Sequence, residues 1–120
     1  IFFDVNSFKI INDSLGHHLG DEVLVKISNV IEKNIRSIDS LGRWGGDEFL
    51  IILPQTNLSQ TKNIISHLEK QLTKIQYSKS INVTCSFGIA SCEQNDTLDS
   101  LLKKADESMY EEKTRLKIKS

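Results

Sequence analysis

Apolar residues recur along this chain with two different periods, and the shorter period predicts strands. The nearly continuous apolar run 1–5 is typical of a strand buried on both faces, with an acid near its end. Segments 41–44 and 49–53 flank two glycines and predict a hairpin with a tight turn. Apolar and polar residues alternate over 81–89, which predicts a strand with one buried face. Residues 115–120 are expected to add a short edge strand.

The longer period, close to one helical turn, predicts amphipathic helices. The first long helix is expected to begin near Glu22 and to reach Ile35. A second should follow the capping pair Asn57 and Gln60 and end before Tyr77. Each of these segments leaves a charged or polar face for solvent.

Two further helical segments are less regular. Residues 8–15 could make a short helical turn before Gly16 and Gly20 break it, which predicts a loop of special geometry ahead of the first long helix. Asp96 is expected to cap the last helix. Helices interleaved with a hairpin-containing sheet indicate an α+β sandwich of the ferredoxin-like kind, with a mainly antiparallel central sheet surrounded by helices.

Composition narrows the class of protein. The 120 residues, 38% hydrophobic and 26% charged, suffice for one domain with one core. A net charge of -1 offers no overall basic field for DNA. The segment contains no apolar run of roughly 18 residues, so the sequence predicts no membrane contact by this segment. Cys85 and Cys92 fit reduced thiols of a cytoplasmic domain, alone or within a larger protein. Because the chain opens with Ile1 inside an apolar run, we expect it to be cut from a longer polypeptide.

Three carboxylates are the candidate chemistry. Asp4 ends the first strand, while Asp47 and Glu48 lie in the hairpin turn, so all three meet if that strand pairs with the hairpin. Carboxylates gathered in this way share protons or bind a hard cation such as Mg²⁺, which suits phosphoryl or nucleotidyl transfer. A solvated turn is the alternative explanation for the Asp-Glu pair. Gly45 and Gly46 would allow a bulky ligand or a partner subunit to approach the backbone closely.

Three polar residues between the first strand and the first long helix could bind a nucleotide. Lys9 and free backbone N–H groups could hold a polyphosphate, although a lysine in such a position is more often a solvated surface residue. Asn12 and Asp21 offer an amide and a carboxylate that can read the edge of guanine, and either could instead be a helix cap.

Four ordered motifs together resemble one family. Residues 45–49 read Gly-Gly-Asp-Glu-Phe, the signature that names the GGDEF family of diguanylate cyclases. Residues 4–13 resemble the family's D-x-D-x-F-K-x-x-N-D segment, and 16–21 its G-H-x-x-G-D loop. Residues 86–90 resemble its S-x-G-I-A strand, and 105–110 its A-D-x-A-M/L-Y helix. The resemblance covers nearly the whole chain and implies a nucleotidyl-cyclase-like fold.

The resemblance implies an enzyme that joins two GTP molecules into cyclic di-GMP and releases pyrophosphate, working as a homodimer. Asp4, the Val5 carbonyl and Asp47 would hold Mg²⁺ or Mn²⁺, and Asp47 or Glu48 would help to deprotonate the attacking hydroxyl. The residues expected to bind the rest of the substrate are Ser7, Phe8, Lys9, Asn12, Asp21, Gly45, Gly46, Lys113 and Lys117. The alternative is a degenerate domain that binds GTP or cyclic di-GMP and regulates a partner.

Arg36 and Asp39 lie where the family places an inhibitory site for its product. A guanidinium and a carboxylate at this spacing could hold cyclic di-GMP, whereas the bare pattern also fits an ion pair at a helix end. Three departures from the family stand out. The segment that normally precedes the first strand is missing from the domain, Asn6 replaces an acid, and Lys117 stands where the family usually has arginine.

Overall fold

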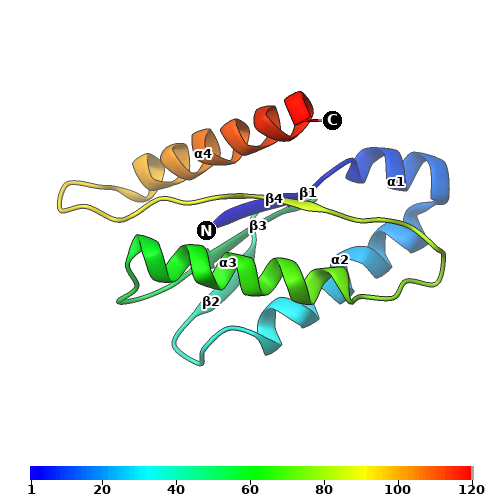
Figure 1. Ribbon diagram of the computed structural model, residues 1–120, viewed down its shortest axis with the longest axis horizontal. Coiled ribbons are helices and arrows are strands. Elements are labelled where there is room, and N and C mark those ends of the chain that lie inside the picture. The colour runs from blue at the N-terminus through cyan, green and yellow to red at the C-terminus, as the bar shows by residue number, and fades with distance from the viewer. Residues whose placement is uncertain (120) are drawn as a thin grey trace.

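A four-stranded antiparallel sheet forms the middle of the molecule (Figure 1). The computed structural model describes residues 1–119, and the side chains of residues 1–115. The strand order is β2-β3-β1-β4, so β1 is central and pairs with both neighbours. The strands are β1 (Phe2–Val5), β2 (Ser40–Arg43), β3 (Glu48–Ile52) and β4 (Cys85–Gly88). The predicted α+β class, the hairpin and the central antiparallel sheet are confirmed.

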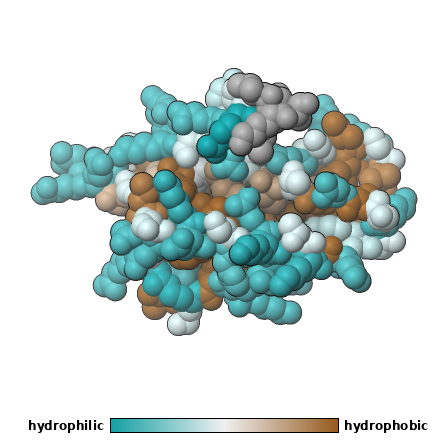
Figure 2. All heavy atoms as spheres, in the orientation of Figure 1, coloured by the Kyte–Doolittle hydropathy of each residue, from teal (hydrophilic) through white to brown (hydrophobic). Residues whose placement is uncertain are grey.

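Helices cover both faces of this sheet. In Figure 1, α4 lies on one side of the strands, and α2 and α3 lie on the other. The helices are α1 (Phe8–Leu15), α2 (His17–Lys33), α3 (Leu58–Thr73) and α4 (Leu98–Lys119). Among residues 1–119, no helix is long and apolar enough to cross a membrane. Polar side chains cover much of the face in Figure 2, and apolar ones gather over α1, where Ile10 and Leu15 are exposed.

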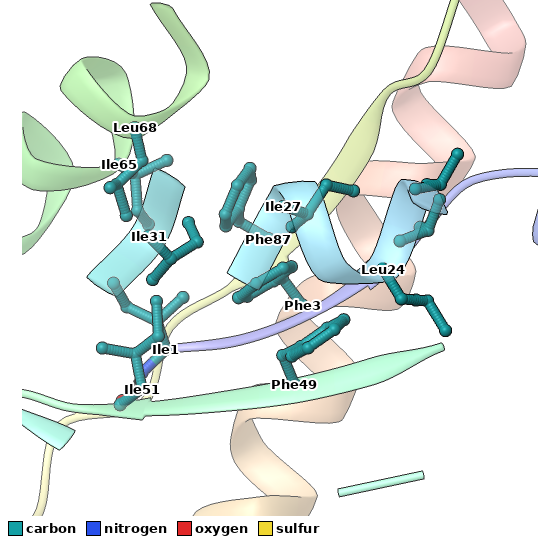
Figure 3. Close-up of a cluster of buried hydrophobic side chains, with 12 residues drawn as sticks. Ile1, Phe3, Leu24, Ile27, Ile31, Phe49, Ile51, Ile65, Leu68 and Phe87 are labelled. Atoms are coloured by element: carbon teal, nitrogen blue, oxygen red, sulfur yellow. Dashed lines mark hydrogen bonds between the residues drawn. The ribbon is translucent and has the colours of Figure 1, made fainter. Parts of the chain in front are cut away.

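The larger core lies between the sheet and the helices α2 and α3. Phe3 is at its centre, because its ring stands 5.0 Å from the ring centroids of both Phe49 and Phe87 (Figure 3). Ile27 from α2 and Leu68 from α3 close over these rings. Side chains alternate along a strand, so the odd-numbered residues of β1 enter this core and the even-numbered ones face α4.

That alternation directs Asp4 toward α4. Its neighbour on the same face, Phe2, packs with Ala105 and Met109 of α4 in a second, smaller cluster. β1 is therefore buried on both faces, as predicted, and its second face carries an acid as well as an aromatic ring.

The first long helix begins earlier than predicted. α2 starts at His17 rather than near Glu22, so the expected loop of special geometry is wrong except at Gly16. Gly16 has a φ of 95°, a conformation that ends α1 and starts α2. Gly20 lies inside α2, and a Cβ there would collide with the side chain of Asn12. This glycine is therefore explained by close packing of α1 on α2 and not by a break.

The strand over 81–89 is shorter than predicted. β4 spans only Cys85–Gly88, because its partner β1 ends at Val5, which pairs with Cys85. The N–H of Asn6 still bonds the Thr84 carbonyl at 2.8 Å, and pairing ends there. β2 and β3 each begin one residue before the predicted position.

The ends of α4 also differ from expectation. Thr97 is the capping residue instead of Asp96, since its hydroxyl accepts the N–H of Ser100 at 3.1 Å. The edge strand predicted for 115–120 is wrong for the described part, where the helix continues to Lys119, and Ser120 lies outside the described residues. No glycine or proline interrupts this segment. The capping pair predicted for α3, Asn57 with Gln60, is confirmed.

Side chains of α4 also accept hydrogen bonds from backbone N–H groups along the outer edge of β4, where an added strand would pair. Ser108 accepts the Ile89 N–H at 3.0 Å, and Glu112 accepts the Phe87 N–H at 3.5 Å. An edge strand with its donors bonded in this way has less need of another strand beside it.

Gly88 is predicted to be essential for seating α4 on the sheet. A Cβ at Gly88 would meet backbone atoms of Ala105 and Met109, which cannot move aside as a flexible side chain would. Gly88→Ala is therefore expected to lower the free energy of unfolding by about 3 kcal/mol. Gly42→Ala is the control, because a Cβ there meets nothing within 4 Å and should change stability by less than about 0.5 kcal/mol. Urea unfolding measures both, and equal stabilities would contradict this packing.

Candidate functional site

The carboxylates of the first strand and the hairpin meet as the sequence predicted. β1 and β3 pair in a register that sets Asp4 opposite Glu48. The N–H of Val5 bonds the Asp47 carbonyl at 3.1 Å, which fixes the hairpin turn to the end of β1. Backbone pairing alone therefore places the three acids at one end of the sheet, independently of any ligand.

Asp4 is the buried member of this group, with 6% of its surface exposed. Its Oδ2 accepts a hydrogen bond from the Lys113 ammonium of α4. Its Oδ1 is buried and has no hydrogen-bond partner. Burial raises the pKa of Asp4, with smaller contributions from Asp47 and Asp106, although the Lys113 ammonium opposes the shift. A buried carboxylate with a free lone pair is prepared for a further cation.

The pKa of Glu48 is also raised, first by burial and then by the charges of Asp47, Asp4 and Asp106. A carboxylate whose pKa is moved toward neutrality is a better general base than an ordinary surface acid. Glu48 also differs from Asp4 in its contacts. Lys113 donates a hydrogen bond to Asp4, whereas no cationic side chain among the described ones donates to Glu48.

A cavity of about 460 Å³ lies beside these acids and is lined by residues of both the sheet and α4. Asp4 and Glu48 line it from the sheet, and Asp106 and Lys113 line it from the helix. Sequence reasoning missed Asp106 as a site residue. Its signal was available in the spacing, because Asp106 lies seven positions before Lys113 and therefore on the same face of α4.

The acidic site fits a divalent cation that arrives with a phosphate ligand. Among the described residues, no three His, Cys, Asp or Glu side chains are arranged to hold a metal ion by themselves. Mg²⁺ is commonly bound through one or two carboxylates together with substrate phosphates, so a complete protein cage is not required. The unpartnered Oδ1 of Asp4 supplies one such oxygen.

Arg43 holds the turn that carries Asp47. Its guanidinium donates to the carbonyl of Gly45 at 3.1 Å and to that of Gly46 at 2.6 Å. Sequence reasoning missed this residue, which has no motif to mark it. A Cβ on Gly46 would meet nothing within 4 Å, so space beside the turn is open on this side.

The residues predicted to hold phosphate begin immediately after β1. Ser7 precedes α1 and has a φ of 58°, which turns the chain sharply from strand to helix. Lys9 is exposed on the first turn of α1, and Phe8 is half-buried. Lys117 lies in α4, but its side chain is outside the described part of the chain.

The two residues predicted to read guanine are brought close together. The side chain of Asn12 packs against Gly20, the neighbour of Asp21 along α2. Asp21 is exposed, so its carboxylate is accessible. Neither residue caps a helix, because Gly16 occupies the junction between α1 and α2.

Asn6, which replaces an acid in the first motif, turns toward β4. Its Oδ1 accepts from the Ser86 hydroxyl at 2.8 Å, and its amide donates to the Thr84 hydroxyl at 3.0 Å. Both contacts bind the chain after β1 to the neighbouring strand. In this structure Asn6 therefore has a structural role: it bonds Ser86, the residue that pairs with Asp4 in the sheet, and does not itself line the acidic cavity.

Arg36 and Asp39 form an ion pair beyond the end of α2. Nη2 of Arg36 lies 2.8 Å from Oδ1 of Asp39, and the Arg36 N–H donates to Oδ2 at 2.8 Å. Hydrogen bonding from Arg36 lowers the pKa of Asp39. The pair lies beside a pocket of about 320 Å³ that Asn63 and Ile64 of α3 also line.

Fold and site together define an α+β domain with an acid-lined cavity at one end of an antiparallel sheet. The family model described as "Diguanylate cyclase, GGDEF domain" matches residues 1–118, and the chain belongs to this family. Cys85 and Cys92 are both free thiols, and neither lines the acidic cavity.

Known relatives agree with this assignment. The diguanylate cyclase DgcM of Escherichia coli K12 is 35% identical over 94% of this chain, and the response regulator PleD of Caulobacter vibrioides is 36% identical over 94%. The chain spans only 28% and 26% of these two proteins. Among solved structures, the diguanylate cyclase SiaD of Pseudomonas aeruginosa, in complex with its activator SiaC, is 32% identical with a TM-score of 0.90, over 95% of this chain and 45% of that one. The GGDEF domain of YfiN from the same species is 35% identical with a TM-score of 0.86, over 95% and 74%.

Asp4 is expected to reduce stability at neutral pH. Because burial raises its pKa in the folded state, folding becomes less favourable as pH rises through the unfolded and folded pKa values. Asp4→Asn should therefore increase the free energy of unfolding at neutral pH by about 1 kcal/mol. The gain should shrink as pH falls through the raised pKa of Asp4 and vanish below about 4, the ordinary pKa of an unfolded aspartate.

Denaturant unfolding at several pH values measures this difference. Asp13→Asn is the matched control, since Asp13 is an exposed acid on α1. A destabilised Asp4→Asn variant at neutral pH would show that the Lys113 pair stabilises the fold more than burial of the carboxylate destabilises it.

Proposed function

We propose that this domain is a diguanylate cyclase that condenses two GTP molecules into cyclic di-GMP with release of pyrophosphate. One observation carries the proposal: the buried, half-partnered carboxylate of Asp4 lies opposite Glu48 in the sheet. Family membership and the names of the relatives agree with it. The free thiols of Cys85 and Cys92 fit the reducing cytoplasm, where we place the domain.

The other predicted site residues bind the rest of the GTP molecule in this proposal. Asn12 and Asp21 read the guanine edge, and Asp21 accepts from its ring and exocyclic N–H groups. Backbone N–H groups of Ser7 and Phe8, at the start of α1, bind phosphate oxygens. The triphosphate is neutralised by Lys9, Lys113 and Lys117. The open space beside Gly46, at the turn it forms with Gly45, admits the ligand.

Asp4, the Val5 carbonyl and Asp47 would hold Mg²⁺ or Mn²⁺. When bound, such an ion would neutralise charge on the phosphoryl oxygens. Lys113 would then exchange its contact with Asp4 for a phosphate oxygen, so the chain's own cation would remain close to the reacting group.

The reaction requires two domains facing one another, each with one GTP. Glu48 or Asp47 takes the proton from a 3′-hydroxyl, and that oxygen attacks the α-phosphorus of the other GTP. A new P–O bond forms while the bond between the α-phosphorus and the bridging oxygen breaks, and pyrophosphate leaves. The same step on the other side closes the ring. The raised pKa of Glu48 makes its carboxylate a better proton acceptor than an ordinary surface glutamate.

Arg36 and Asp39 are proposed to bind the product, cyclic di-GMP, at a second site. A microbial GGDEF domain solved for its interaction with cyclic di-GMP is 31% identical to this chain, with a TM-score of 0.79 over 95% of this chain and 71% of that one. The guanidinium could bind a phosphate and the carboxylate a guanine edge.

The hairpin acids provide the test of catalysis. Asp47→Asn and Glu48→Gln keep the size of each side chain, so both variants should retain their melting temperature. Loss of the proton acceptor is expected to reduce cyclic di-GMP synthesis by at least about 100-fold in the Glu48 variant. Chromatography after incubation with GTP and Mg²⁺ measures the product, and Glu32→Gln, an exposed acid of α2, is the control.

Synthesis that survives in both variants would remove these carboxylates from the mechanism. An unmutated protein that binds cyclic di-GMP but makes none would instead favour the regulatory binding module.

Nucleotide choice is expected to depend on Asp21. Adenine has no ring N–H on the edge that Asp21 would read, so GTP should bind at least about tenfold more tightly than ATP. Asp21→Ala should remove most of that preference, whereas Asp13→Ala, another exposed acid of the same region, should keep it. Equilibrium titration with each nucleotide in the presence of Mg²⁺ measures the ratio. Equal affinities in the unmutated protein would refute the assignment.

A further inference from the structure

The guanidinium of Arg36 is folded over the carboxylate of Asp39. Nε donates to Oδ2 at 3.0 Å and Nη2 to Oδ1 at 2.8 Å, which is the two-point geometry of a strong arginine–carboxylate pair. The Asp39 side chain is only 1% exposed, whereas that of Arg36 is 48% exposed. The carboxylate is therefore covered, and the guanidinium is part of its cover.

A second loop fixes the guanidinium in this position. Nη2 of Arg36 also donates to the Thr56 hydroxyl at 2.7 Å and to the Pro54 carbonyl at 3.1 Å. The Thr56 hydroxyl in turn donates to the Pro54 carbonyl at 2.9 Å. These contacts come from the connection between β3 and α3, so they join two segments that are separated in the sequence.

This arrangement conflicts with the way a ligand would use the pair. Asp39 already accepts hydrogen bonds from Nε, from Nη2 and from the backbone N–H of Arg36. A guanine edge can reach the carboxylate only if the guanidinium moves away. Thr56 makes no hydrogen bond to Asp39, so its hydroxyl, which bonds Arg36 and the Pro54 carbonyl, can affect the ion pair only by holding Arg36.

We propose that Thr56 is a positioning residue that sets the affinity of this site for cyclic di-GMP, by holding Arg36 across Asp39 in a closed arrangement that the ligand must open. The inference rests on the proposed product site and adds a residue to it. The adjacent pocket, which Thr56, Gln60 and Asn63 line together with the pair, gives the displaced guanidinium and the ligand a common space.

The energetic consequence follows from the two arrangements. Only the open one binds the ligand through both charged groups, so the measured dissociation constant exceeds the intrinsic one by the inverse of the open fraction. A change that weakens the closed arrangement without altering Arg36 or Asp39 raises that fraction and tightens binding.

Thr56→Val tests this directly, because valine has nearly the same shape and lacks the hydroxyl. Loss of this hydrogen bond is expected to lower the dissociation constant for cyclic di-GMP by about fivefold. Thr56→Ser keeps the hydroxyl and should bind like the unmutated protein. Calorimetric titration of nucleotide-free protein measures all three, and thermal melting checks that each is folded. Unchanged or weaker binding by a folded Thr56→Val variant would overturn the proposal.

A second measurement does not depend on affinity. The Arg36 Nε–H, bonded to Asp39 in the closed arrangement, should exchange slowly with water in NMR spectra of the free protein and faster in Thr56→Val. Equal exchange rates in the two proteins would also overturn the proposal.

Arg36→Ala separates the failure of this inference from the failure of the site. If Arg36→Ala binds cyclic di-GMP as tightly as the unmutated protein, the product site itself is wrong. If Arg36→Ala loses binding while Thr56→Val does not gain it, the site stands and only the role of Thr56 is refuted.

Discussion

The pairing of Asp4 with Lys113 is the contact on which the acidic site depends. Strand pairing places the Asp4 carboxylate beneath α4, on the central strand of the sheet, where burial disfavours the ionised form. One ammonium compensates part of this effect and leaves Oδ1 without a partner. A carboxylate in this position reduces stability and offers a binding oxygen, a combination that is common where binding or catalysis is selected at the expense of packing.

The fold tolerates this acid because the opposite face of the same strand is well packed. Phe3 stacks with Phe49 at an interplanar angle of 12° and also contacts Phe87, so β1 is held from both neighbouring strands. Aromatic pairs of this kind add to the free energy gained from burying their area. The register that stacks these rings also sets Asp4 opposite Glu48, so core packing and site geometry follow from one pairing.

Much of this arrangement could be predicted from the sequence, because hydrophobic period and motif order both carry it. The position of β1 beside the hairpin, the capping of α3 and the meeting of Asp4 with Glu48 are confirmed. The start of α2 could not be predicted in this way, since Gly20 reads as a helix breaker unless its contact with Asn12 is known. That contact joins two helices, and local sequence preferences do not encode it.

The site residues show the same limit. Asp106 joins the acidic cavity only because α4 crosses the sheet beside β1, and Arg43 matters only because its guanidinium reaches back to the turn carbonyls. The pattern of Arg36 and Asp39 left an ion pair and a ligand site as alternatives, and the structure shows the ion pair. The two alternatives are compatible when the pair opens.

Both proposed ligand sites therefore share one electrostatic feature. At each site, the carboxylate that we propose to bind the ligand already pairs with a basic side chain of the same protein. Asp4 pairs with Lys113, and Asp39 pairs with Arg36. Leaving a buried or covered carboxylate without a partner would destabilise the free protein, so an internal cation is the less costly resting state. On the proposed functions of the two sites, ligand binding would exchange one ionic contact for another instead of adding a new one. The affinity of each site is consequently a difference between two sets of contacts, and residues that touch only the resting pair can change it.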